Sequence, residues 1–123
     1  MSTAQAPRAL IIQDHDGISR MLAGAFKAAG YVVDETLDGE EGVAKARTGD
    51  YTLICVDDIL SDMNGFEIMR ALKAQAFAGA VFFTSSSPDF VRLALAHGAH
   101  HAVMIPFDLA DVTAEARAVT ARA

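Results

Sequence analysis

Short apolar runs alternate along the chain with longer stretches in which apolar residues recur every three or four positions. The short runs are rich in Val, Ile, Phe and Leu, a composition that predicts strands at residues 9–12, 31–34, 53–56, 81–84 and 102–105. Most of these runs are apolar at consecutive positions. Continuous apolarity is typical of parallel strands in a sheet that helices cover on both faces.

The stretches between the runs have helical spacing. The first carries a single apolar stripe, formed by Ile18, Met21, Leu22, Ala25, Phe26 and Ala29. Gly30 predicts the end of this helix in a left-handed conformation. Asn64, Pro88 and Asp108 indicate the starts of three further helices, and residues 40–47 form the weakest helical segment. The repeated strand–helix order predicts an α/β fold with a doubly wound parallel sheet, whose ligand sites lie at the C-terminal ends of its strands.

Polar residues gather directly after three of these strands. Gln13 and Asp14 follow the first strand, Asp57 and Asp58 end the third, and Thr84 ends the fourth. Carboxylate oxygens are ligands that Mg²⁺ prefers, so we expect a shallow cation site at this edge. For three of the acids, we expect capping and turn roles instead. These acids are Asp16, Asp58 and Asp62.

The whole chain from residue 8 onward resembles a receiver domain of two-component response regulators, the CheY-like fold. The segments that carry the resemblance are ALII followed by Gln13 and Asp14, DDILSDMNG at 57–65, VFFTS at 81–85 and GAHHAVMIPF at 98–107. The resemblance implies a flavodoxin-like strand order 2-1-3-4-5 with five helices, and a cis peptide bond before Pro106.

The resemblance also implies roles for individual residues. Asp57 is the expected phosphoryl acceptor, and Thr84 is the hydroxyl expected to sense the phosphoryl group. Asp14, Asp57 and the backbone carbonyl of Ile59 are the expected ligands of Mg²⁺. Gln13 stands where a second acid is usual, and we expect it to contact a metal-bound water at most, so that the metal binds weakly.

Two further residues differ from the family pattern at positions that the resemblance links to the conformational change after phosphorylation. Ile105 stands where the family has a lysine, and Ala102 stands where it has a mobile aromatic residue. The site loses one acid and one lysine, so its formal charge stays at −2 on the residues Asp14 and Asp57. Two functional hypotheses follow. The first is a receiver that accepts a phosphoryl group on Asp57 with an atypical switch; the second is a pseudo-receiver that binds proteins independently of phosphorylation.

Composition limits the number of domains, the class of partner and the cellular compartment that we expect. The chain has 123 residues, of which 52% are hydrophobic, and we expect a single receiver-like domain over residues 1–123 with a flexible tail at 1–7. The formal charge of −6 opposes direct nucleic-acid binding. Neither a signal peptide nor a membrane segment is indicated, and the single cysteine, Cys55, suits a reducing cytoplasm.

Alternative chemistry is less well supported. The string DHDGI at 14–18 is similar to the nucleophile motif of haloacid-dehalogenase-type phosphatases, but no lysine follows Thr84, so we expect no enzyme. His97, His100 and His101 invite a zinc interpretation, but Gly98 interrupts their helix. By resemblance, the partners are a histidine kinase or phosphotransfer protein and an unknown downstream protein. The last two helices and the fifth strand form the expected partner face, through which the chain could also form a homodimer.

Overall fold

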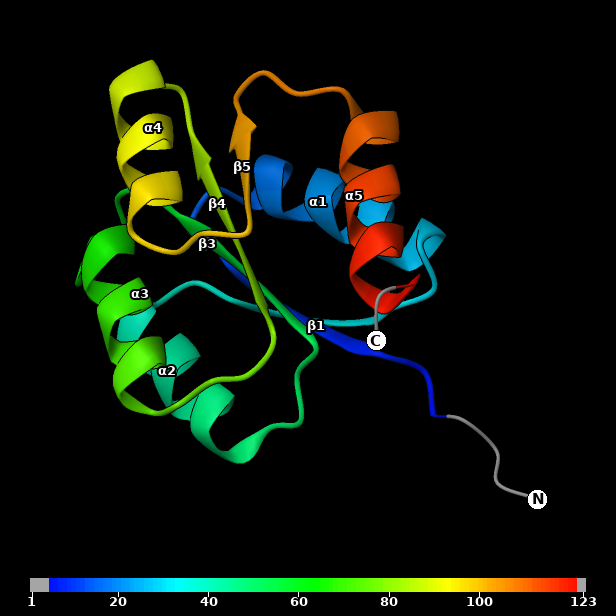
Figure 1. Cartoon of the computed structure of the whole chain (residues 1–123), viewed down its shortest axis with the longest axis horizontal. Helices are drawn as coiled ribbons and strands as arrows, with labels where there is room; N and C mark the ends of the chain where they lie inside the picture. Colours follow the sequence, from blue (N-terminus) through cyan, green and yellow to red (C-terminus); the bar gives the residue numbers. More distant parts are fainter. Residues whose placement is uncertain (1–4, 122–123) are drawn as a thin grey trace.

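The computed structural model describes residues 5–121 and contains one five-stranded parallel sheet in the order β2-β1-β3-β4-β5 (Figure 1). The strands are β1 (Arg8–Ile12), β2 (Val32–Thr36), β3 (Leu53–Asp57), β4 (Ala80–Ser85) and β5 (His101–Met104). The helices are α1 (Asp16–Ala28), α2 (Gly39–Thr48), α3 (Gly65–Ala74), α4 (Pro88–Ala96) and α5 (Leu109–Ala121). The predicted fold class and strand order are thus confirmed.

Two helical layers enclose the sheet. Helices α1 and α5 lie on one face, where Phe26 and Val112 pack with Phe82 in one core cluster. Helices α2, α3 and α4 lie on the other face, where Ile68 and Ala94 pack in a second cluster (Figure 1). The strands are apolar at consecutive positions because successive side chains enter opposite clusters. No helix within residues 5–121 combines the length and the apolarity that crossing a membrane requires.

Strand register decides which side chains share a face at the C-terminal edge of the sheet. Ile12 pairs with Val56, and Asp57 pairs with Thr84. Because side chains of paired residues in parallel strands point to the same face, the register places Gln13, Asp57 and Thr84 in one row on the α1 and α5 face. Asp58 and Ser85 follow on the opposite face. The edge therefore carries two separate polar groups.

Element boundaries differ slightly from the prediction. β2 begins at Val32 and runs to Thr36 because it pairs residue by residue with β1 from Arg8 to Ile12. Tyr31 is instead buried beside the strand, where its hydroxyl donates to the carbonyl oxygen of Ala116 at 2.7 Å. β5 is placed one residue earlier than predicted, because its register follows β4. The strand limits differ because they are set by pairing with a neighbouring strand, and the sequence of one strand does not determine that pairing.

Local signals fixed the helix ends. The Asn64 side chain caps α3 in a reciprocal pair with Glu67, and Ser87 caps α4 just before Pro88. Gly30 follows α1 with a φ of 97°, as the prediction required. Of the predicted tail, residues 1–4 lie outside the described residues. The carbonyl of Pro7 accepts a hydrogen bond from the Val32 amide at 2.8 Å.

Candidate functional site

Asp57 and Thr84 meet at the ends of β3 and β4. The Thr84 hydroxyl donates to Oδ1 of Asp57 at 3.0 Å, and its side chain is fully buried. Gly65 begins α3 directly against this strand end, where a side chain would collide with the carbonyl oxygen of Asp57 and the ring of Phe83. The spacing from Asp57 to Gly65 thus has a steric reason. It lets α3 pack close enough to hold the acidic strand end in place.

The environment of Asp57 weakens its acidity. The pKa of this carboxyl is raised to about 6, mainly by burial and also by the negative charge of Asp58. Hydrogen bonding from Thr84 acts in the opposite direction and lowers the pKa. Asp57 is half-buried, so it is shielded from water and yet open to a reactant. At neutral pH most of it is ionised, which is the form that acts as a nucleophile.

Gln13 lies beside Asp57 with 1% of its surface exposed. Its Oε1 accepts a hydrogen bond from the backbone N–H of His15 at 3.1 Å. Its Nε2 is buried and has no hydrogen-bond partner among residues 5–121. The Gln13 amide has a small lowering effect on the pKa of Asp57, although no hydrogen bond joins the two side chains in this structure. A buried donor thus lies next to the carboxylate.

The oxygen atoms expected to hold a cation come from the end of β3 and from the loops that follow β1 and β3. Asp14 is exposed at the end of β1 and, among the described residues, makes no side-chain hydrogen bond. Ile59 forms an isolated bridge with Asn64 just after β3, and its side chain is 61% exposed. Asp14, Asp57 and the Ile59 carbonyl are all oxygen donors, and this chemistry fits Mg²⁺, which keeps several waters. The Oε1 atom of Gln13 accepts one hydrogen bond, from His15, and an amide oxygen has a second lone pair, so the contact with a metal-bound water stays a prediction.

Two other acids of the β3–α3 segment have structural contacts. Oδ2 of Asp58 accepts a hydrogen bond from the Ser85 hydroxyl at 2.7 Å, and the Ser85 oxygen accepts one from the Ser87 amide at 2.9 Å. Asp62 accepts bonds from the amides of Gly39 and Glu40, both at 2.9 Å, and so caps α2. The capping role expected for Asp62 is confirmed. The hydrogen bond between Ser85 and Asp58 was not predicted from the sequence. A signal for it was present, because Asp58 directly follows Asp57 and Ser85 directly follows Thr84.

On the β5 side of the site, Ile105 stands at the position where the resemblance implies a lysine. Ile105 and Ala102 are both half-buried, and the peptide bond between Ile105 and Pro106 is cis, as the resemblance implies. The last lysine of the chain, Lys73, lies in α3. Asp57 is therefore without a lysine partner on this side.

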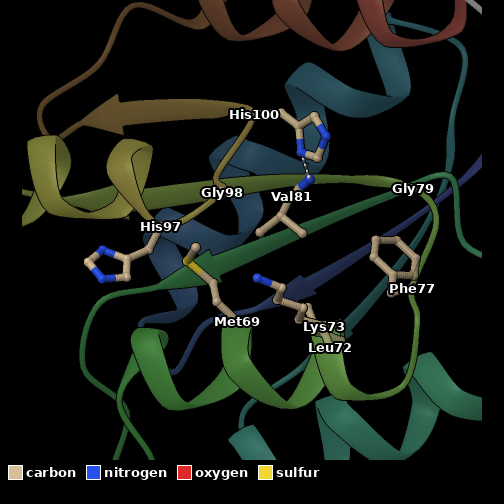
Figure 2. A pocket seen from close by; sticks show the side chains of 9 residues that line it. All are labelled: Met69, Leu72, Lys73, Phe77, Gly79, Val81, His97, Gly98 and His100. Atoms are coloured by element: carbon tan, nitrogen blue, oxygen red, sulfur yellow. Dashed lines mark hydrogen bonds between the residues drawn. The ribbon is translucent and has the colours of Figure 1, made fainter.

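The histidines point to separate surroundings. Nδ1 of His100 accepts from the Val81 amide at 3.0 Å, whereas His101 packs edge-on against Phe82. Figure 2 shows His97 and His100 at different places around a hollow between α3 and the loop that joins α4 to β5, with Met69 and Lys73 rising from α3. This hollow measures about 220 Å³, which is smaller than most ligand pockets. In the described part of the chain, no three His, Cys, Asp or Glu residues converge on a metal position.

Cys55 is buried in the middle of β3, as expected for a core residue. Burial raises the pKa of its thiol, and the nearby charge of Asp57 acts in the same direction. The thiol is therefore uncharged and unreactive at neutral pH.

Comparison with known proteins agrees with this geometry. The family model of the response regulator receiver domain matches residues 9–117. Response regulator ArlR of Staphylococcus aureus is 32% identical over 114 residues, which cover 92% of this chain and 52% of ArlR. The chain thus spans about half the length of the curated relatives that it matches.

Solved structures show the same fold. Chemotaxis response regulator CheY4 of Vibrio cholerae is 25% identical, with a TM-score of 0.81 over 94% of this chain and 99% of CheY4. The BeF3-activated DrrB receiver domain is 21% identical, with a TM-score of 0.85 over 96% of this chain and all of that one, 100%. Given the family match, the strand order and the acidic strand end, the chain belongs to the response regulator receiver domain family of two-component systems.

Proposed function

We propose that this receiver accepts a phosphoryl group on Asp57 from a histidine kinase or phosphotransfer protein. It then acts through protein contacts and not as an enzyme. The observation that carries the proposal is the pairing of a half-buried carboxylate with the buried Thr84 hydroxyl at 3.0 Å. A reducing cytoplasm is the proposed setting, which suits the single buried thiol of Cys55.

The reaction is a nucleophilic substitution at phosphorus. An ionised oxygen of Asp57 forms a bond to the phosphorus of the donor's phosphohistidine, and the phosphorus–nitrogen bond breaks. The departing imidazole keeps the electron pair and takes up a proton. The product is a mixed anhydride on Asp57, to which the Thr84 hydroxyl can donate a hydrogen bond.

Asp14, Asp57 and the Ile59 carbonyl are the proposed ligands of Mg²⁺. When bound, this ion neutralises the negative charge that otherwise keeps the carboxylate and the phosphoryl group apart. Only two of these ligands are carboxylates. We therefore expect weak binding, because affinity for a hard cation rises with the charge of its ligands.

The switch depends on few residues. Moving a two-state protein from 1:99 to 99:1 requires about 5.5 kcal/mol of differential stabilisation. A hydrogen bond to a charged group supplies about 1.5–3 kcal/mol, so Thr84 alone produces a partial shift. Since Ile105 carries no charge and Ala102 has no ring to reorient, phosphorylation is expected to change partner affinity by roughly ten- to a hundredfold and not in an all-or-none manner.

Phosphoryl transfer is tested with acetyl phosphate and Mg²⁺, followed by intact-protein mass spectrometry. We expect one added phosphoryl group on the wild type and none on Asp57→Asn. Asp62→Asn is the matched control because Asp62 lies in the following loop and caps α2, and it retains incorporation.

The pseudo-receiver is the alternative, and the apolar residues at 102 and 105 favour it. A wild-type protein that stays unmodified with acetyl phosphate, and also with a phosphorylated histidine phosphotransfer domain, would contradict phosphoryl acceptance. That result would support a binding module that works without phosphorylation.

The proposed partner surface is the face formed by α4, β5 and α5, and its proposed occupant is a second copy of this chain. β5 is an edge strand of the sheet, and it lies between the two helices (Figure 1). Large apolar side chains are exposed on all three elements, namely Leu95, Met104 and Leu109 at 48%, 39% and 42%. Such a surface is typical of a contact site.

The dimer is tested by sedimentation velocity with and without acetyl phosphate. Met104→Glu is expected to abolish any dimer, whereas Leu37→Glu leaves it intact, because Leu37 is 55% exposed in the β2–α2 loop. A monomer in all conditions would contradict self-association.

A further inference from the structure

We propose that Gln13 binds the phosphoryl group, with its amide N–H donating a hydrogen bond to a phosphoryl oxygen on Asp57. Gln13 would then supply the contact that Ile105 cannot make. This inference rests on the proposed phosphorylation of Asp57, and it assigns Gln13 to the phosphoryl group and not to the metal.

Strand register brings Gln13 to the acceptor. β1 and β3 are neighbours, with Ile12 opposite Val56, so the next positions place Gln13 beside Asp57 on the same face of the sheet. Thr84 flanks Asp57 on its other side. The carboxylate thus lies between an amide and a hydroxyl that come from the two adjacent strands.

The amide of Gln13 is held in one orientation. The atom facing the backbone N–H of His15 must be an acceptor, so the oxygen occupies that position at 3.1 Å. Turning the amide over would place an NH₂ group against an N–H donor. The Nε2 group therefore stays on the other side of the amide, buried and without a partner among the described residues.

An unpartnered buried donor is unfavourable in a folded protein, and such groups occur where a ligand or reactant completes them. A phosphoryl group on Asp57 brings three acceptor oxygens into this space. Thr84 can satisfy one of them, and Gln13 a second. Both donors are neutral, so the unphosphorylated site holds no buried cation that lacks a partner.

A role through a metal-bound water would make different demands. It would use the acceptor oxygen of Gln13, which already accepts one hydrogen bond from the His15 N–H, and would leave the buried Nε2 without a partner among the described residues. It would also make any effect of Gln13 depend on the Mg²⁺ concentration, because the amide would act through the ion. A direct donor keeps its effect when Mg²⁺ is saturating.

The experiment measures binding of beryllofluoride, BeF₃⁻, by ¹⁹F NMR at increasing Mg²⁺. BeF₃⁻ attaches to a carboxylate oxygen and presents fluorine acceptors in place of phosphoryl oxygens. We expect Gln13→Leu and Gln13→Met to bind it about tenfold more weakly or worse at saturating Mg²⁺, which is the effect of losing one hydrogen bond to a charged group. Two variants are used so that a packing defect in one does not decide the result, and thermal unfolding verifies that each is folded.

Gln75→Leu is the matched control. Gln75 is a partly buried glutamine whose amide oxygen has no hydrogen-bond partner among residues 5–121, and it lies at the C-terminal end of α3, whereas Asp57 precedes the N-terminal end of that helix. We expect wild-type affinity for BeF₃⁻ in this variant.

A rescue experiment separates a donor role from a packing role. Adding Ile105→Lys to Gln13→Leu returns a donor to the site, and we expect it to recover most of the lost affinity. The same lysine in the wild type should add less, because Gln13 already makes the contact.

The outcomes distinguish this inference from the function on which it rests. A wild type that binds no BeF₃⁻ and accepts no phosphoryl group overturns both. Normal binding by the wild type and by both Gln13 variants overturns the donor role alone. A defect that disappears at saturating Mg²⁺, or a Gln13→Glu variant that binds BeF₃⁻ more tightly there, assigns Gln13 to the metal and also overturns it.

Discussion

The acceptor edge and the β5 flank of this receiver differ in their chemistry, although they are adjacent in the sheet. The acceptor edge consists of Gln13, Asp57 and Thr84, which carry an amide, a carboxylate and a hydroxyl. The β5 flank consists of Ala102 and Ile105, which carry only hydrocarbon. At these positions, only the acceptor edge carries polar side chains.

The difference separates two tasks. Accepting a phosphoryl group requires a nucleophile and groups that stabilise negative charge, and the acceptor edge contains both. Transmitting the event to a partner requires an element with two arrangements, and under the proposed function the uncharged, non-aromatic residues Ala102 and Ile105 limit this second task. Under the proposed function, phosphoryl acceptance and signalling to a partner therefore depend on different residues of the fold.

The largest effect on stability is expected from Asp57→Asn, and it depends on pH. Folded Asp57 holds its proton up to about pH 6, whereas an unfolded aspartate releases its proton near pH 4. Between these values the folded state binds more protons, so wild-type stability falls as the pH rises through this window. Asp57→Asn cannot ionise and should melt several degrees above the wild type at pH 8.

The difference should disappear below pH 4, where Asp57 is neutral in both states. Differential scanning fluorimetry across the pH range measures it. If the melting temperatures of the two proteins changed with pH in the same way, burial would not raise the pKa of Asp57.

A smaller effect is expected from exchanging side chains across β4 and β5. Thr84 and Val103 are paired in register, and both are buried. Thr84→Val removes the hydroxyl that donates to Asp57, and we expect a loss of about 1–2 kcal/mol in the free energy of unfolding at pH 8, where Asp57 is ionised.

The matched exchange is Val103→Thr, which buries a hydroxyl in β5, between the two residues of the β5 flank, at all pH values. Its cost of about 1–3 kcal/mol should not change with pH. Urea unfolding of both variants at pH 4.5 and pH 8 compares the two regions directly. A pH-independent cost for Thr84→Val would remove the distinction between them.

The smallest effect is expected from Ile105→Lys, which places a cation on the β5 flank. A positive charge on the Asp57 side of the sheet should lower the pKa of Asp57 below 6 and contribute up to about 1 kcal/mol at neutral pH. The carboxyl ¹³C shift of Asp57 followed against pH reports this change, with Ile105→Met as the neutral control. An unchanged titration would mean that the lysine extends into solvent and that the flank does not reach the acceptor.

Much of the fold could be predicted because its signals are local. The apolar runs indicated a parallel sheet, the stripe from Ile18 to Ala29 indicated α1, and Asn64 and Gly30 marked helix ends through their own backbone preferences. The strand limits could be predicted only to within one or two residues. β2 and β5 take their limits from β1 and β4, and this pairing is set by neighbours far along the chain.

The site shows the same division. Motif spacing singled out Asp57 and Thr84, and the structure brings them together at 3.0 Å. Residue spacing did not reveal that Ser85 contacts Asp58. That contact depends on the register between β3 and β4, which places Asp57 opposite Thr84 and the next two residues side by side.

The sequence by itself determined which functional groups this receiver has: a nucleophilic carboxylate, a hydroxyl, one glutamine in place of an acid, and no lysine after Lys73. Only the tertiary structure decided how these groups face one another. The Gln13 oxygen is taken by a neighbouring backbone N–H, and this leaves its nitrogen buried beside Asp57. Residue type fixes the available donors and acceptors, but their orientation follows from strand register and from the competing hydrogen bonds that the folded chain supplies.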